Sequence, residues 1–203
     1  MANVIVFPGK PPTKFGFKRV QKRTRKRFDP NQLDLFSTPS GNVLHLPKTI
    51  GRFEEALLLD ERGDPKAVDA YWTAISQGDC VDDAYCNLGI LESQQGRTAK
   101  AFDCFTKSLK ADPRHFETHY NLANQYFETG DLVLARVHYE IAAEIQPGYP
   151  NTQFNLGLVH ALDGEFGRAV EAFTRYRDMA PKKEIDKVVD LLSGLKQTLA
   201  TQG

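Results

Sequence analysis

The sequence predicts an all-α fold, a solenoid of stacked helix hairpins. Three observations support this prediction. Small and apolar residues recur every 34 residues in three copies, a glycine lies inside each copy, and a proline lies near its end. A fixed period of this length is typical of repeat architectures, in which each unit buries its apolar face against its neighbours. The recurring positions are Leu88, Leu122 and Leu156; Gly89, Ala123 and Gly157; Gly96, Gly130 and Gly164; Ala101, Ala135 and Ala169; Phe105, Tyr139 and Phe173; Pro113, Pro147 and Pro181.

Residues 1–46 are expected to form a disordered basic arm. The chain has 26 basic and 26 acidic residues, but this stretch holds nine basic residues against two acidic ones. It also holds five of the 11 prolines, and its apolar residues are sparse and aperiodic. Such a segment buries too little apolar surface to offset the entropy lost on ordering. The remaining residues, 47–203, are correspondingly acidic.

The array is predicted to span residues 47–181 and to begin with a degenerate copy, 47–81. Ala67, Tyr71 and Ala74 match second-helix positions of the later copies, but the interval from Gly63 to Ala67 is one residue shorter than theirs. Terminal repeats are commonly atypical, because one of their faces meets solvent.

Three full copies follow, and each is expected to form two helices. The glycine lies where the helices join, and the proline ends the second helix because it cannot continue one. Small residues stand where paired helices approach closely, and the aromatic residue fills the space between them. The copies span residues 82–115, 116–149 and 150–181.

Residues 182–203 are predicted to form a capping helix and tail. Apolar residues fall on one helical face there and would cover the last copy. That stripe consists of Ile185, Val188, Val189, Leu192, Leu195 and Leu199.

The three full copies closely resemble the tetratricopeptide repeat. The stretch NLGILESQQGRTAKAFDCFTKSLKADP carries nearly the whole signature of that family. The resemblance implies a right-handed α-solenoid that binds proteins and is not an enzyme, with the first helix of each pair lining a concave groove. One departure is Tyr176, which stands where the family has a small residue, and it suggests altered packing there.

An asparagine precedes the repeated leucine in each full copy, at Asn87, Asn121 and Asn155. The family resemblance implies that these side chains point into the groove. An amide offers both donors and an acceptor, so it can bond to the main chain of an extended peptide. The row is similar to the asparagine ladder of the O-linked N-acetylglucosamine transferase superhelix and is expected to hold a peptide at regular steps. Asn124 would add a fourth amide. Alternatively, these asparagines cap or hydrate the helix surface.

Apolar and aromatic side chains are expected to line the same groove. The resemblance also implies that Cys86, Tyr120 and Phe154 replace the lysines of repeats that bind acidic chaperone C-termini, so such ligands are disfavoured. An extended peptide with hydrophobic side chains and a basic residue fits better. The lining residues are Ile90, Tyr120, Phe127, Phe154 and Leu158.

The arm contains a basic run that suggests a second kind of partner. Such clusters bind nucleic acid backbones without sequence specificity, and in a eukaryotic host they also serve as nuclear localisation signals. Two alternatives are a solvated tail and an arm that lies in the protein's own groove until a partner displaces it. The run consists of Lys18, Arg19, Lys22, Arg23, Arg25, Lys26 and Arg27.

A short motif follows the basic run. Gln32, Leu33, Asp34, Leu35 and Phe36 resemble the peptide by which bacterial replication and repair proteins bind the DNA sliding clamp. Leu35 and Phe36 would fill an apolar pocket, and Gln32 would bond at its rim. Alternatively, this apolar patch docks on the protein's own helices.

Motifs that carry chemistry are missing from the sequence. It has no phosphate-binding loop, nucleophile elbow or zinc-protease motif, so no enzyme activity and no cofactor are expected. His115 and His119 have a metal-ligand spacing without an evident third ligand, so no metal site is expected. No apolar run approaches the roughly 20 residues that span a bilayer. Three cysteines without paired spacing favour a reducing compartment, hence a cytoplasmic location, or a nuclear one in a eukaryote.

Overall fold

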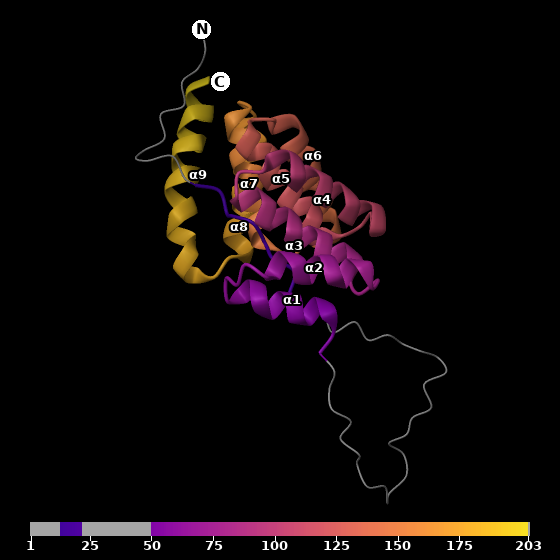
Figure 1. The fold of residues 1–203 in the computed structure, drawn as a ribbon. Helices are drawn as coiled ribbons and strands as arrows, with labels where there is room; N and C mark the ends of the chain where they lie inside the picture. The colour runs from indigo at the N-terminus through magenta and orange to yellow at the C-terminus, as the bar shows by residue number, and fades with distance from the viewer. Residues whose placement is uncertain (1–12, 22–49, 203) are drawn as a thin grey trace, which may run out of the picture.

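A computed structural model describes residues 13–21 and 50–202 of the chain (Figure 1). Residues 50–202 contain helices and connecting turns, while residues 13–21 are extended. The helices are α1 (Arg52–Glu61), α2 (Ala67–Ser76), α3 (Val81–Gln94), α4 (Thr98–Ala111), α5 (Phe116–Thr129), α6 (Leu132–Ile145), α7 (Pro150–Leu162), α8 (Phe166–Met179) and α9 (Lys182–Gln202). No helix in these ranges is long and apolar enough to cross a membrane.

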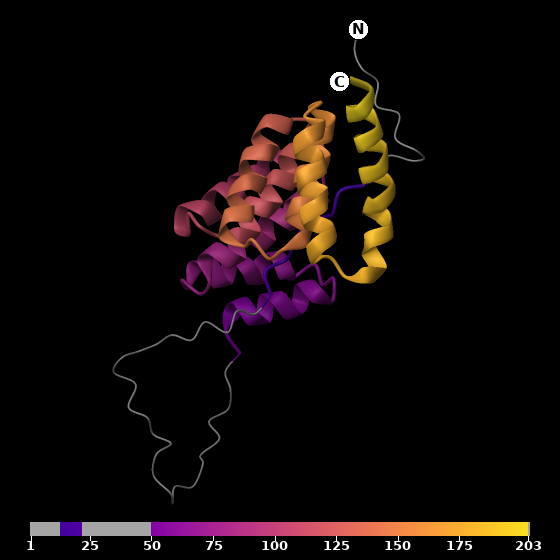
Figure 2. The same cartoon turned by 180° about the vertical axis from the view of Figure 1, so that it is seen from behind.

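The helices pair in chain order and stack as an α-solenoid, which confirms the predicted fold class. α1 packs on α2, α3 on α4, α5 on α6, and α7 on α8, and each hairpin then contacts the next. Figure 1 and Figure 2 show the hairpins following one another from α1 to α8, with α9 alongside the end of the stack. Because α3 also contacts α5, the first helices of successive hairpins lie side by side.

The glycines and prolines of the 34-residue period end the helices as predicted. Gly96, Gly130 and Gly164 follow the first helix of each full copy with φ values of 72°, 84° and 78°, a region that residues with a Cβ adopt at a cost. The second helices end at Ala111, Ile145 and Met179, two residues before each proline. A residue before proline is pushed out of the helical region, so these helices end there.

Gly89 allows α3 to approach α4 closely. A Cβ at this position would lie 2.5 Å from the Phe105 ring, which is fully buried. Gly157 stands in the same relation to Phe173, at 2.8 Å. In these two copies the glycine therefore leaves the space that the aromatic ring of the second helix fills.

We expect Gly89→Ala to lower the free energy of unfolding by about 1–3 kcal/mol, the usual effect of overpacking a core. The loss should appear even though alanine forms helices better than glycine by about 1 kcal/mol. Urea denaturation measures it. Gly167→Ala on α8 is the control, since a Cβ there meets nothing within 4 Å. Equal stability of the two variants would contradict this account of the packing.

The two ends of the stack differ from its middle. In the degenerate copy, Tyr71 and Ala74 of α2 are fully buried, as their match to the repeat implied. On α9, Val188, Leu192 and Leu195 are buried against the last hairpin. The predicted apolar stripe of α9 is wrong in detail: Val189 and Leu199 are 43% and 39% exposed, and Leu191 is buried instead. The buried face is therefore turned towards Leu191 and away from Val189, compared with the predicted stripe.

Buried His119 of α5 and half-buried His138 of α6 form a pair, with their Nδ1 atoms 3.0 Å apart. His119 Nε2 lies 3.0 Å from the Pro113 carbonyl, which can only accept, so Nε2 carries a hydrogen. The neutral His119 ring then accepts at Nδ1 from His138. Burial lowers the pKa of both side chains, that of His138 to about 4. The His115 ring further lowers the pKa of His119, and the His119 ring that of His138.

We expect acid to destabilise the chain through this pair. Both pKa values lie below 6.5 in the folded state and return towards 6.5 on unfolding, so the unfolded chain binds protons first. Stability is therefore complete above pH 6.5 and falls as the pH drops towards 4, by on the order of 2–3 kcal/mol. Urea denaturation at pH 7 and pH 4.5 measures the loss, which His138→Phe should reduce. An unchanged pH dependence in that variant would exclude the pair as its source.

Residues 13–21, which we call the arm segment, cross the solenoid in an extended conformation. Figure 1 and Figure 2 show this segment in indigo, running from the side of α9 towards α1. Phe15 packs against the apolar cluster formed by α7, α8 and α9. Phe17 packs against a second cluster, formed by α1 to α5, in which Val20 is fully buried. The expectation of a disordered arm over residues 1–46 therefore fails for this segment, because the solenoid supplies the apolar surface and the polar partners that the arm itself lacks.

Candidate functional site

The repeated asparagines face the arm segment from three neighbouring helices, α3, α5 and α7. We call this surface of the three helices the inner face. Each asparagine accepts a hydrogen bond at Oδ1 from one main-chain N–H and donates from Nδ2 to the carbonyl of the same residue. The donor–acceptor distances are 2.8 and 3.0 Å for Asn155 with Phe15, 2.7 and 2.8 Å for Asn121 with Lys18, and 2.9 and 3.1 Å for Asn87 with Val20.

The segment runs antiparallel to the order of the repeats, and its steps are unequal. Lys18 follows Phe15 by three positions, and Val20 follows Lys18 by two. At about 3.3 Å per extended residue these steps are roughly 10 and 7 Å, either side of a typical helix spacing of about 8–10 Å. The prediction of regular steps is therefore wrong. Asn124 serves the longer step, donating to the Gly16 carbonyl at 3.1 Å.

Alternation along a strand explains why the longer step is irregular. In extended chain the N–H and C=O of one residue point to the same side, and those of the next residue to the other. Lys18 and Val20 are two residues apart, so both can present their main chain to the inner face. Phe15 is three residues from Lys18, so its contact with the inner face requires a break in the alternation. Gly16 lies at that break and is exposed.

Buried partners fix the orientation of each ladder amide. Asn87 Nδ2 also donates to the Tyr71 hydroxyl at 3.1 Å, and Asn121 Nδ2 contacts Cys86 Sγ at 3.3 Å. Asn155 Nδ2 lies 3.2 Å from the hydroxyl of Tyr139. One N–H of each amide thus points inwards, which leaves the other N–H and the oxygen directed at the segment. Binding groups held this way lose little freedom when a ligand arrives.

An aromatic site receives Phe15. Its ring meets Phe154 edge-on at a centroid distance of 5.0 Å and lies 5.9 Å from Tyr176. The Tyr120 hydroxyl approaches the Phe15 carbonyl at 3.5 Å, and Leu158 belongs to the same apolar cluster. Offset and edge-on aromatic pairs of this kind stabilise beyond simple area burial.

A lysine site receives Lys18. Its Nζ lies 3.2 Å from Glu117 Oε1, and 4.6 and 4.7 Å from the ring centroids of Phe116 and Tyr149. An ammonium group close to two aromatic rings and a carboxylate is stabilised by both cation–π attraction and ion pairing. Glu117 is 9% exposed, so solvent screens this pair less than a surface pair.

The remaining contacts place two further cations and one aliphatic side chain. Lys14 Nζ lies 3.0 Å from Glu128 Oε1 and 5.9 Å from the Phe127 ring. Arg19 pairs with Asp60 of α1 and donates to Gln94 at 3.3 Å. Val20 packs into the cluster that contains Ile90.

A series of polar contacts connects Asn87 of the ladder to Arg19 of the arm segment. The Tyr71 hydroxyl accepts from Asn87 and donates to Asp60 at 3.0 Å, and Asp60 pairs with Arg19. Burial raises the pKa of Tyr71 to about 12, so its hydroxyl keeps the hydrogen that it donates. The degenerate copy, which lacks a ladder asparagine, thus completes the site.

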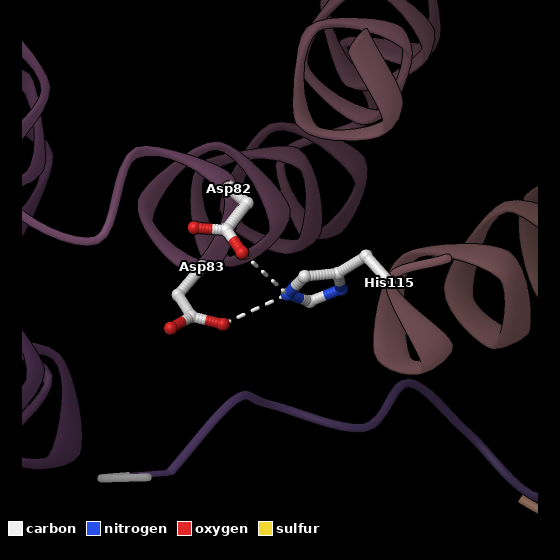
Figure 3. Close-up of side chains that lie close together, drawn as sticks. All are labelled: Asp82, Asp83 and His115. Atoms are coloured by element: carbon white, nitrogen blue, oxygen red, sulfur yellow. Dashed lines mark hydrogen bonds and ion pairs between the residues drawn. The ribbon is translucent and has the colours of Figure 1, made fainter. Parts of the chain in front are cut away.

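A cluster of Asp82, Asp83 and His115 lies beside the inner face (Figure 3). His115 begins α5 as its N-cap, and its Nδ1 accepts from the Thr118 N–H at 3.1 Å. Its Nε2 therefore carries the hydrogen and donates to Asp83 at 2.8 Å. A metal would need that nitrogen unprotonated, which would remove the helix cap. The arrangement fits a structural link between α3 and α5 better than a metal site.

The predicted site residues fall into three groups. Those on the helices, Asn87, Asn121, Asn124, Asn155, Tyr120, Phe127, Phe154, Ile90 and Leu158, contact the arm segment or belong to the clusters that receive it. Lys18 and Arg19, predicted to contact nucleic acid, face carboxylates of this chain. The rest, Lys22, Arg23, Arg25, Lys26, Arg27 and the motif Gln32, Leu33, Asp34, Leu35 and Phe36, lie outside the described residues.

Two residues of the site, Asp60 and Tyr176, are not among those predicted from the sequence. Asp60 lies one period before Gln94 and two periods before Glu128, which also contact the arm segment, so the period is the signal that could have found it. For Tyr176 the sequence predicts only altered packing, as a departure from the repeat. Nothing in the repeat pattern indicates that its ring borders the site. Cys86, expected in the groove, is fully buried, and burial raises the pKa of its thiol to about 12.

Comparison with known proteins identifies the repeats. Residues 82–115 and 104–137 each match a model of the tetratricopeptide repeat, so the chain contains such repeats. A relative from Caenorhabditis elegans, the tetratricopeptide repeat-containing protein trd-1, is 29% identical over 90 residues. That alignment covers 44% of this chain and 12% of the relative, so the chain spans about an eighth of the relative's length.

Solved structures share the fold at low sequence identity. The first repeat domain of Spaghetti (RPAP3), bound to the HSP90 peptide SRMEEVD, is 22% identical, with a TM-score of 0.54, and covers 59% of this chain and 94% of its own. MamA is 19% identical, with a TM-score of 0.56 and coverage of 72% and 95%. The type III secretion translocator chaperone SycD of Yersinia enterocolitica is 18% identical, with a TM-score of 0.53 and coverage of 57% and 83%.

Proposed function

We propose that this chain is a non-enzymatic adaptor whose inner face binds an extended segment of a partner protein. The observation that carries the proposal is the pairing of three equivalent asparagines with both main-chain groups of an extended segment. Main-chain recognition of this kind does not depend on the side chains of the ligand. A surface that holds residues 13–21 in this way is suited to hold another segment.

A similar structure supports the proposal by its ligand. The repeat domain of Spaghetti is bound to a peptide, which shows what related helix hairpins can hold. That peptide, SRMEEVD, ends in acidic residues, whereas the carboxylates of Asp60, Glu117 and Glu128 face the arm segment here. Like charges disfavour an acidic ligand on this inner face. The expected ligand is therefore basic rather than acidic.

The arm segment would compete with any partner. A ligand tethered to its own site has an effective concentration on the order of millimolar for short linkers. A partner peptide therefore meets a site that is already filled. It gains access when its affinity or local concentration exceeds that of the segment, so the unaltered chain should bind partner peptides weakly.

Binding of a peptide in trans tests the proposal. The probe is a fluorescent peptide of residues 13–21, TKFGFKRVQ, and the receptor is the full chain carrying Lys18→Glu and Val20→Asp, which we call the arm-released chain. We expect the probe to bind this chain at least tenfold more tightly than the unaltered chain. Adding Asn87→Ala, Asn121→Ala and Asn155→Ala should abolish binding. Equal binding with and without the asparagines, in chains with unchanged circular dichroism, would refute the proposal.

The basic run supports an alternative function, a nucleic-acid-associated accessory protein recruited through the arm and a sliding-clamp motif. Five of its seven basic residues follow the arm segment in sequence and are not part of that segment. DNA retention that weakens steeply with salt and is lost on deletion of residues 10–27 would support this alternative. Binding of a purified bacterial sliding clamp that is lost in Leu35→Ala and Phe36→Ala would support the motif.

A further inference from the structure

The sites that surround the arm segment define a side-chain pattern as well as a main-chain grip. Building on the proposed function, we propose that the inner face selects a partner segment with an aromatic residue, a lysine three residues later, then an arginine, then an aliphatic residue. Phe15, Lys18, Arg19 and Val20 are the resident example of this pattern. The ladder alone would accept any sequence, so the selectivity comes from the sites between the asparagines.

The lysine site is the most selective of them. It combines a mostly buried carboxylate, Glu117, with the rings of Phe116 and Tyr149, which contact each other and both lie close to one ammonium group. An acidic side chain there would face Glu117 at close range, and an apolar one would leave that carboxylate without its cation. The lysine side chain of the segment is only 26% exposed, so most of its length is in contact with protein.

The aromatic and aliphatic sites fix the register. Phe154 and Tyr176 receive a ring at one end, and the pocket around Val20, which is 0% exposed, admits a small branched side chain at the other. Because the ladder pairs with Phe15, Lys18 and Val20 themselves, a slip by one residue would present each amide with main-chain groups on the wrong side. The spacing of the pattern is thus set by the asparagines, and the residue types by the sites beside them.

The arginine site extends the pattern onto the degenerate copy. Arg19 faces Asp60 and Gln94, and Asp60 is held in place by the Tyr71 hydroxyl. Asp60 is 6% exposed in the presence of the segment. Three cations of the segment therefore each have a carboxylate opposite, and this charge match favours a basic protein segment as the occupant.

A panel of peptides tests the pattern on the arm-released chain. The parent is TKFGFKRVQ, and the variants carry Phe15→Ala, Lys18→Glu or Val20→Asp or hold the same residues in scrambled order. We expect each variant to bind at least tenfold more weakly than the parent, with Lys18→Glu the weakest. Introducing Glu117→Lys into a receptor that keeps Lys18 and is released by Val20→Asp alone should weaken the parent at least tenfold and improve binding of the Lys18→Glu peptide at least tenfold.

The outcomes separate this inference from the proposed function. Equal binding of all peptides, lost when the three asparagines are replaced, would overturn the side-chain pattern and leave the adaptor function standing. No binding of any peptide would overturn both. If the arm-released chain does not fold, amide exchange of residues 13–21 in the unaltered chain replaces the assay: the unlabelled parent at millimolar concentration should accelerate that exchange, and the Lys18→Glu peptide should not.

A second copy of this chain also carries residues 13–21 and is therefore an alternative ligand for the inner face. Light scattering of the unaltered chain is expected to give the mass of one chain, because residues 13–21 fill the inner face of their own chain. A dimer that dissociates when the arm is released would assign the inner face to a second copy and overturn the proposal of a partner protein.

Discussion

Replacing Asn87, Asn121 and Asn155 by alanine should release the arm segment from the inner face while the helices remain. The change removes six hydrogen bonds to the segment's main chain. At about 0.5–1.5 kcal/mol each, the loss is several kcal/mol, enough to turn a bound segment into a largely free one. Trypsin should then cleave after Lys14, Lys18 and Arg19 far faster than in the unaltered chain.

The control for this experiment removes three amides elsewhere. Gln77, Gln146 and Gln197 are exposed and take no part in the contacts with the arm segment described above, so their replacement by alanine should leave cleavage unchanged. Circular dichroism distinguishes release of the segment from unfolding of the solenoid. Unchanged cleavage in the asparagine variant would mean that packing of Phe15 and Val20 holds the segment without the ladder.

The ladder also shows what the sequence could and could not predict. Its residues were identifiable because the period of 34 repeats them, and the same period located the helix boundaries. The occupant was not identifiable in the same way. Residues 13–21 have no periodicity of their own, and their order depends on surfaces that exist only after the hairpins have stacked. Low apolar content predicted disorder, since that argument counts only the surface a segment buries within itself.

The acidic partners were hidden for a related reason. Opposite net charges of the arm and the solenoid were evident from composition, and they suggested contact without naming a pair. Asp60 lies in the copy that departs most from the repeat, so it was recognisable only through its distance of one period from Gln94, which also contacts Arg19. Phe116 and Tyr149 stand at the two ends of one copy, 116–149, and the site that they form beside Lys18 appears only in three dimensions.

Tyr176→Ala should have the largest effect on stability. Tyr176 is fully buried, and its ring lies 5.0 Å from that of Phe154 and 5.9 Å from that of Phe15. Its hydroxyl donates to Glu184 of α9 at 3.2 Å. Truncating a buried aromatic side chain typically lowers the free energy of unfolding by about 3–5 kcal/mol. Here the loss should also loosen α9 and the N-terminal end of the arm segment.

Tyr176→Phe separates the ring from the hydroxyl. Phenylalanine keeps the ring contacts and loses the bond to Glu184, so we expect a loss of only about 1 kcal/mol, with the arm segment still protected from trypsin. Urea denaturation and trypsin cleavage measure the two effects. If Tyr176→Ala destabilised the chain without exposing the segment, the aromatic site would not depend on this ring. The small residue that the repeat would place here could not join the last hairpin, the cap and the segment, so the departure at Tyr176 closes one end of the binding surface.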